Sequence, residues 1–248
     1  MEAAGLGLFM LSACAFATLL EHPASPARRA LPNGFLRRAL MGLAMGLTAV
    51  AIIYSPWGQR SGAHINPATT WTFFRLDKMH AWDAVFYTLF QFLGAGAGVA
   101  LSLALLGRKR LADPAVSWVE TRPGRPGPAL AFAIELLMAF GMMTMVLRVS
   151  NDHDLARYTG LFAGVLVALY ITLLAPLSGM SINPARTFGS AAFAGRFSFF
   201  WLYATAPVLG MLLAGEAHIR LDPACHVRCA KLNHSGQARC IFICAGKP

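Results

Sequence analysis

The chain alternates between long apolar blocks and short polar connections. Apolar blocks lie at about 3–20, 37–55, 82–106, 129–148, 159–177 and 197–215. Each is about long enough to cross a bilayer as a helix. The connection at 122–128 is too rich in proline and glycine to be helical. This pattern predicts an all-α membrane protein with six transmembrane helices.

One short sequence occurs twice, each time after an apolar block. It reads SGAHINPA at 61–68 and SGMSINPA at 178–185, so the copies differ only at their third and fourth positions. Asn is a favourable N-cap, and Pro suits the first position of a helix. We therefore expect a short helix after each Asn, over about 67–75 and 184–194. Both helices are too short to span a membrane.

A motif repeated in two parallel apolar contexts is typical of an inverted-repeat membrane fold. The two short helices would then be re-entrant half-helices whose positive N-terminal ends face each other near the midplane. The residues at these ends are Asn66, Pro67, Ala68, Asn183, Pro184 and Ala185. We expect both Asn amides to donate to a permeating molecule. The alternative is that each Asn-Pro pair merely starts a loop.

Composition excludes several functional classes. The 248 residues are 56% hydrophobic and 13% charged, which is far from a soluble domain. The net charge of +10 comes from scattered basic residues without a basic stripe, so we expect lipid headgroup contacts and no nucleic acid. Acids are isolated and the spans contain no Ser-His or Cys-His pairing, so the chain is not expected to be an enzyme or to require a cofactor. No basic region precedes the first apolar block, which argues against a cleaved signal peptide.

With its paired Asn-Pro-Ala boxes and Arg186 after the second, the chain resembles the aquaporins of the major intrinsic protein family, bacterial water-channel branch, over about 1–217. The resemblance implies a homotetrameric, multi-pass water channel of the cell (inner) membrane that excludes protons and ions. Its repeats would span about 1–107 and 129–217, followed by a tail at 218–248. It also implies cytoplasmic termini, although Lys and Arg are spread evenly over both sides and give this orientation no support.

The resemblance also implies a narrow selectivity filter. Its four positions correspond to Met45, Ile171, Met180 and Arg186, with Gly46 as an alternative to Met45. Water channels of the family usually have an aromatic residue and a His in this ring, so Met45 and Ile171 make it less polar and wider. Glycerol, ammonia or hydrogen peroxide are therefore alternative solutes. Thr187 and Ala191 replace an Asp and a basic residue that are usual in the glycerol-conducting branch, which favours water.

Two acidic residues fall inside apolar blocks, where a charge is costly and usually functional. The resemblance implies that Glu2 and Glu135 each accept backbone N–H bonds from a re-entrant loop; a terminal or lipid-facing acid is the alternative. Because Glu2 lies so near the start, we expect further residues upstream or a frayed first turn. His64, beside the first box, is expected to be a structural residue bonded to loop carbonyls.

The tail has its own candidate chemistry. Cysteines cluster there, accompanied by His226 and His234: they are Cys225, Cys229, Cys240 and Cys244. Thiolates and imidazoles suit zinc or copper(I), so a zinc site is one hypothesis. Reduced thiols or a pair of disulfides are the alternatives. A second functional hypothesis follows, a metal- or redox-responsive membrane protein whose bundle is an anchor or a gated pore.

Overall fold

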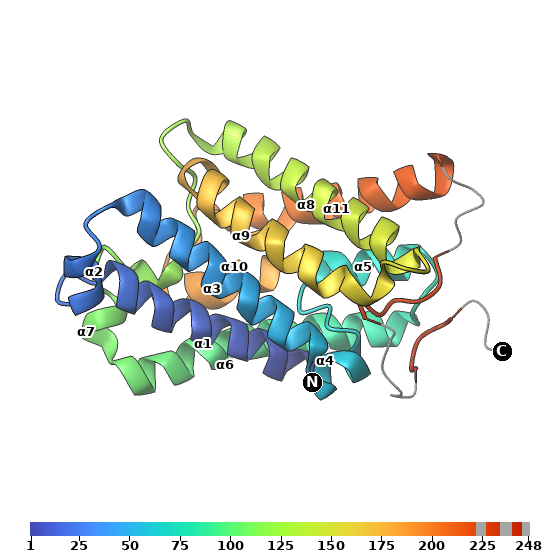
Figure 1. Ribbon diagram of the computed structural model, residues 1–248, viewed down its shortest axis with the longest axis horizontal. Helices are drawn as coiled ribbons and strands as arrows, with labels where there is room; N and C mark the ends of the chain where they lie inside the picture. Colours follow the sequence, from blue (N-terminus) through green and yellow to red (C-terminus); the bar gives the residue numbers. More distant parts are fainter. Residues whose placement is uncertain (222–226, 234–239, 245–248) are drawn as a thin grey trace.

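A bundle of helices makes up the computed structural model, which describes residues 1–221, 227–233 and 240–244. Within these ranges there is no strand. Six helices are long and apolar enough to cross a membrane, as predicted. They are α1 (Glu2–Glu21), α3 (Gly34–Tyr54), α6 (Ala81–Leu106), α8 (Pro128–Asn151), α9 (Thr159–Ser178) and α11 (Phe200–Leu221), and Figure 1 shows them side by side. The last apolar block, expected at about 197–215, continues as helix to Leu221, so α11 extends a few residues past the expected start of the tail at 218.

The two predicted half-helices have the expected bounds, α5 (Pro67–Arg75) and α10 (Pro184–Ala194). They lie in the interior, α10 toward one end of the bundle and α5 toward the other (Figure 1). Each begins with an Asn cap and a Pro, as the local sequence requires. The remaining short helices lie in the connections: α2 (Pro26–Ala30), α4 (Pro56–Ser61), α7 (Arg108–Leu111), η1 (Ser117–Val119) and η2 (Ala156–Tyr158).

The packing of the long helices repeats between the two halves. In the first half α1 packs on α6, in the second half α8 packs on α11, and α3 and α9 join the halves. Small residues permit these close crossings. A Cβ added at Gly46 would lie 2.4 Å from the carbonyl oxygen of Gly164, and one added at Gly98 would lie 2.3 Å from that of Gly7. The backbones therefore touch at positions that only glycine can occupy.

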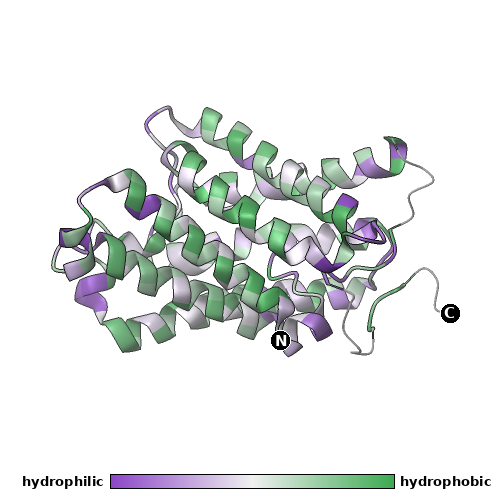
Figure 2. Ribbon diagram, in the orientation of Figure 1, coloured by the Kyte–Doolittle hydropathy of each residue, from purple (hydrophilic) through white to green (hydrophobic). Residues whose placement is uncertain are grey.

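The outer surface of the bundle is apolar along its length. Figure 2 shows hydrophobic positions along the long helices and hydrophilic positions concentrated toward the two ends of the bundle. Many large apolar side chains are exposed on this surface, among them Leu43, Leu47, Phe86, Leu93, Leu137, Leu161, Val165, Leu173 and Leu213. An apolar belt between two polar ends suits a protein surrounded by lipid.

The N-terminus, α4 and the tail lie at the same end of the bundle (Figure 1). The tail residues in 227–233 and 240–244 form no helix or strand. Even so, Val227, Cys229, Ala230, Leu232 and Phe242 belong to the same buried apolar cluster as the helices. The described part of the tail is thus packed against the helix bundle, whereas the sequence had suggested a separate segment.

Candidate functional site

A cavity of about 490 Å³ lies between the helices, bounded by Glu21 toward one end and by Leu232 toward the other. The loops that precede the half-helices form part of its wall: the first loop, residues 62–66, and the second loop, residues 179–183. Most of the remaining wall is apolar. Polar side chains of the wall come from the two loops (His64, Asn66, Ser181 and Asn183) and from residues outside them (Glu21, Arg37, Arg38, Thr69, Glu120 and Arg186).

Each box begins its half-helix with an Asn cap. Asn66 Oδ1 accepts a hydrogen bond from Ala68 N at 2.9 Å. Asn183 Oδ1 accepts from Ala185 N at 3.1 Å and from Arg186 N at 3.2 Å. The side-chain oxygens are thus used by the backbone, and the orientation of each amide is fixed.

The amide nitrogens connect the two loops. Asn66 Nδ2 donates to the carbonyl of Ile182, and Asn183 Nδ2 donates to the carbonyl of Ile65, both at 2.7 Å. Each amide has a second hydrogen, and both Asn side chains line the cavity. The sequence did not predict this contact, in which one N–H of each amide holds the opposite loop; donation of the other N–H to a permeating molecule stays a prediction.

The loops adopt a backbone conformation that side chains rarely accept. Ile65 has φ 41° and Ile182 has φ 46°, in equivalent positions of the two copies. A positive φ is unusual for a β-branched residue, and such strain persists only when surrounding contacts enforce it. Because of this conformation, the carbonyls of Ile65 and Ile182 make no helical hydrogen bond and instead accept from the opposite loop.

Glu135 helps to hold the second loop in this strained conformation. Its Oε1 accepts from Ser178 Oγ at 2.8 Å and Ser181 N at 2.9 Å, and its Oε2 accepts from Ile182 N at 2.6 Å. The residue is fully buried. The carboxylate therefore lies behind the loop and does not face lipid.

Glu2 makes the equivalent contacts in the first half. Its Oε1 accepts from Ser61 Oγ at 2.7 Å, and its Oε2 accepts from Ile65 N at 2.6 Å and Gln91 Nε2 at 2.7 Å. Glu2 is buried and lies in the first turn of α1. The frayed first turn expected from the sequence is therefore absent from the described chain.

A pair of tyrosines adds a support that sequence reasoning missed. Tyr87 on α6 donates to the carbonyl of Ser61 at 2.8 Å, and Tyr203 on α11 donates to that of Ser178 at 2.5 Å. These helices occupy equivalent places in the two halves. The similar distance along the chain from each repeated Ser to a Tyr is the signal that could have found them.

The four predicted filter residues all line the cavity: Met45, Ile171, Met180 and Arg186. Gly46 does not line it and instead packs on Gly164. Arg186 Nη1 is buried and has no hydrogen-bond partner within the described residues. The ring around this arginine is otherwise apolar.

Thr187 lies behind the cavity wall. Its hydroxyl is hydrogen bonded to Ser181 Oγ at 2.5 Å and Thr121 Oγ1 at 2.9 Å. Neither Thr187 nor Ala191 is among the residues that line the cavity. Thr187 therefore contacts the cavity only through Ser181, which does line it.

His64 lines the cavity, and its ring connects the first loop to the tail. Nε2 lies 2.7 Å from the carbonyl of Ala230, so it carries the proton, and Nδ1 accepts from Thr70 Oγ1 at 3.0 Å. The ring stacks on Phe73 at 5.1 Å and on Phe242 at 5.5 Å between centroids. The predicted carbonyl partner exists, but it belongs to the tail.

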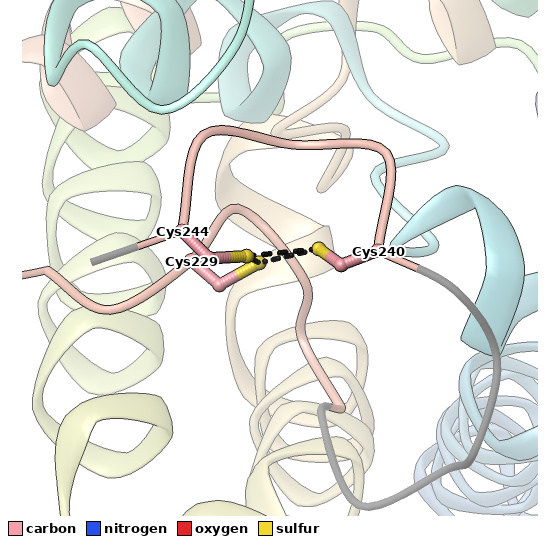
Figure 3. Close-up of side chains that lie close together, drawn as sticks. All are labelled: Cys229, Cys240 and Cys244. Atoms are coloured by element: carbon pink, nitrogen blue, oxygen red, sulfur yellow. Dashed lines mark hydrogen bonds between the residues drawn. The ribbon is translucent and has the colours of Figure 1, made fainter. Parts of the chain in front are cut away.

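Three of the four predicted tail thiols lie together. The Sγ atoms of Cys229, Cys240 and Cys244 are separated by 3.3, 2.9 and 3.0 Å. Figure 3 shows the three side chains converging from two stretches of the tail. Cys225 lies outside the described residues, as do His226 and His234.

Comparison with known proteins identifies the class. The profile of the family described as "Major intrinsic protein" matches residues 2–218. The "Glycerol uptake facilitator protein-like 6" of Lactiplantibacillus plantarum is 36% identical over 177 residues, 70% of this chain and 81% of its own length. "Aquaporin NIP6-1" of Arabidopsis thaliana is 35% identical over 171 residues, 68% of this chain and 54% of its own length.

A solved structure has the same fold. The X-ray structure of the aquaglyceroporin from Plasmodium falciparum superposes with a TM-score of 0.70 at 19% identity, covering 90% of this chain and 95% of that one. Fold and cavity thus define a multi-pass membrane channel. The chain belongs to the major intrinsic protein family, whose members conduct water and small neutral solutes such as glycerol.

Proposed function

We propose that this channel conducts water through the cavity between the two loops and excludes protons and ions. The observation that carries the proposal is the reciprocal bonding of Asn66 and Asn183 at the meeting point of the half-helices. This bonding fixes both amides beside the cavity and leaves one N–H of each available to donate to a bound molecule. A water molecule there accepts from the amides, so its own hydrogens point away along the cavity.

The half-helices strengthen this orientation. Their positive N-terminal ends meet at the two Asn residues, so water on either side is oriented in opposite senses. Opposed orientations interrupt a continuous chain of hydrogen-bonded water, along which protons would otherwise move. The same positive potential, together with the Arg186 guanidinium, repels cations.

Small neutral solutes are the second candidate, and the apolar filter favours them. Met45, Ile171 and Met180 offer no hydrogen bond opposite Arg186, so the ring suits a molecule with an apolar side and a polar side. Glycerol has an apolar and a polar side. Ammonia and hydrogen peroxide are small enough to pass the same ring. The similarity to a glycerol uptake facilitator supports this candidate.

Stopped-flow light scattering on proteoliposomes tests both candidates. Water permeability well above that of empty vesicles is expected. If a reduced chain that ends at Leu221, and so lacks the tail, gave no more permeability than empty vesicles, the proposal would be refuted. Glycerol, urea and ammonia are measured on the same vesicles. Replacement of Ile171 by His removes an apolar wall and adds a hydrogen-bonding group to the ring. The apolar side of glycerol then loses its contact, so glycerol permeability should fall more than water permeability.

Assembly and location follow from the same proposal. We infer a homotetramer in the cell (inner) membrane, because the apolar outer surface includes helix faces that a second copy or lipid can cover. Cross-linking of the protein in native membranes tests this inference. A ladder ending at four chains is expected, and a monomer alone would contradict it.

A further inference from the structure

We propose that Cys229, Cys240 and Cys244 bind a thiophilic metal ion, with zinc as the working example, and that the bound ion closes the channel by holding the tail over its mouth. The site goes beyond conduction, which needs no metal. The closure rests on the proposed conduction, whereas binding of the ion does not. The two can therefore be tested separately.

The geometry of the three thiols fits a metal ion. Their ligand atoms all lie within 4.8 Å of one another, from residues buried or half-buried in the tail. Zinc binds thiolates at ~2.3 Å, which places the sulfurs of a tetrahedral site about 3.8 Å apart. The observed separations of 2.9 to 3.3 Å therefore need to widen by less than about 1 Å. Each thiol releases its proton to solvent as its bond to the ion forms.

The charge around the site also fits. Three thiolates and one divalent ion leave one net negative charge. Lys231 is buried in the same stretch of tail and acts electrostatically on both Cys240 and Cys244. Its ammonium offsets the excess charge of the complex, so the loaded site can stay buried.

The tail needs such a link. The described stretches of the tail contain no helix or strand. Backbone groups tie them to the rest of the chain through bonds such as Leu232 N to Gly62 O at 3.2 Å, Ile243 N to Lys78 O at 3.1 Å and Arg228 N to Asn151 Oδ1 at 2.6 Å. An irregular segment loses conformational entropy on docking. A metal ion joined to both stretches contributes binding free energy to the docked form alone.

The docked tail occupies the mouth at the first-loop end. Leu232 lines the cavity itself. Ala230 accepts from His64, and Phe242 stacks on the same imidazole at 5.5 Å. A Cβ on Gly62 would lie 2.8 Å from the Phe242 ring. The site therefore stabilises a plug in direct contact with the first loop.

Zinc binding is tested on the full chain, reduced and reconstituted, by equilibrium dialysis followed by elemental analysis. About one tightly bound zinc per chain is expected, and Cys240→Ser should lose it. Cys14→Ala is the matched control, because Cys14 is buried in α1 away from the tail, and it should keep the zinc. Absence of bound zinc, or an intact disulfide within the trio in freshly purified protein, would overturn the site.

Closure is tested by stopped-flow on the same vesicles. Zinc at the loading concentration should lower water permeability several-fold in the full chain and in Cys14→Ala. It should have no effect on Cys240→Ser or on a chain that ends at Leu221, both of which should remain open. Bound zinc with unchanged permeability would overturn the closure while leaving both the site and the proposed conduction in place.

Discussion

Asn66 and Asn183 each donate a side-chain hydrogen bond at 2.7 Å to the carbonyl that precedes the other. The two bonds are related by the inverted repeat, as are the strained Ile65 and Ile182 that supply the carbonyls. Each half of the chain therefore holds the central loop of the other half. The geometry of the cavity depends on both.

Replacement of Asn183 by Asp should break this reciprocity. A carboxylate cannot donate, so the carbonyl of Ile65 loses its partner at a cost of about 1–3 kcal/mol. The negative charge would also attract cations into a region that the half-helices keep positive. We expect a proton or potassium leak, measured with a pH-sensitive dye and an ion-selective electrode in vesicles.

The matched control for that experiment is Asn151→Asp. Asn151 donates to Leu147 O and accepts from Arg228 N, and it does not line the cavity. The same chemical change there should give no leak. A leak of equal size in both variants would mean that the effect is general destabilisation.

Arg186→Ala should relax the filter. The change removes the guanidinium from an otherwise apolar ring, so the opening becomes larger and loses a positive charge. Permeability to glycerol and urea should rise several-fold relative to water in stopped-flow assays. Arg196→Ala is the control, because Arg196 pairs with Glu120 at 2.8 Å and does not line the cavity. Unchanged permeability in Arg186→Ala would exclude the filter role.

Glu135→Gln should destabilise the second loop. Both carboxylate oxygens accept backbone N–H bonds, and an amide would direct its own N–H toward one of these donors. Each charge-assisted bond lost costs about 1.5–3 kcal/mol. The melting temperature in detergent should therefore fall clearly. Glu216→Gln, at a partly exposed ion pair with Arg75, should change stability by less than about 1 kcal/mol.

A pair of glycine substitutions should separate close packing from helix propensity. Gly46→Ala places a Cβ 2.4 Å from the carbonyl of Gly164, so α3 and α9 must move apart. Gly96→Ala meets nothing within 4 Å and should stabilise α6 by about 1 kcal/mol. Thermal unfolding should show shifts of opposite sign. Equal shifts of the melting temperature would mean that α3 and α9 accommodate the added methyl group without loss of stability.

Local signals made much of the fold predictable. Apolar block length located the six spans, and an Asn cap followed by Pro located both half-helices to the residue, because the chemistry that starts these helices is contained in the motif. The last apolar block was expected to end at about 215, whereas α11 continues to Leu221. Its last two turns include the polar residues Glu216, His218 and Arg220, so hydropathy falls before the helix ends at Leu221.

Contacts between single residues far apart in the sequence were harder to predict. Nothing periodic in the sequence places Ala230 and Phe242 on His64. For Tyr87 and Ser61 the only signal is the similar Ser-to-Tyr spacing in the two halves. Such contacts depend on how elements distant in sequence are arranged, and one sequence contains no record of that arrangement. The filter positions could be located only by resemblance, since Met45 and Ile171 have no chemical mark that distinguishes them from other apolar residues.

The crosswise bonding of the two loops has a consequence for biosynthesis. When the ribosome has made only the first half, the amide of Asn66 has no Ile182 carbonyl to bind, and the carbonyl of Ile65 has no donor from Asn183. The first loop therefore lacks both hydrogen bonds until the second loop is present. The cavity wall formed by the two loops can thus be completed only after both halves of the chain have been made.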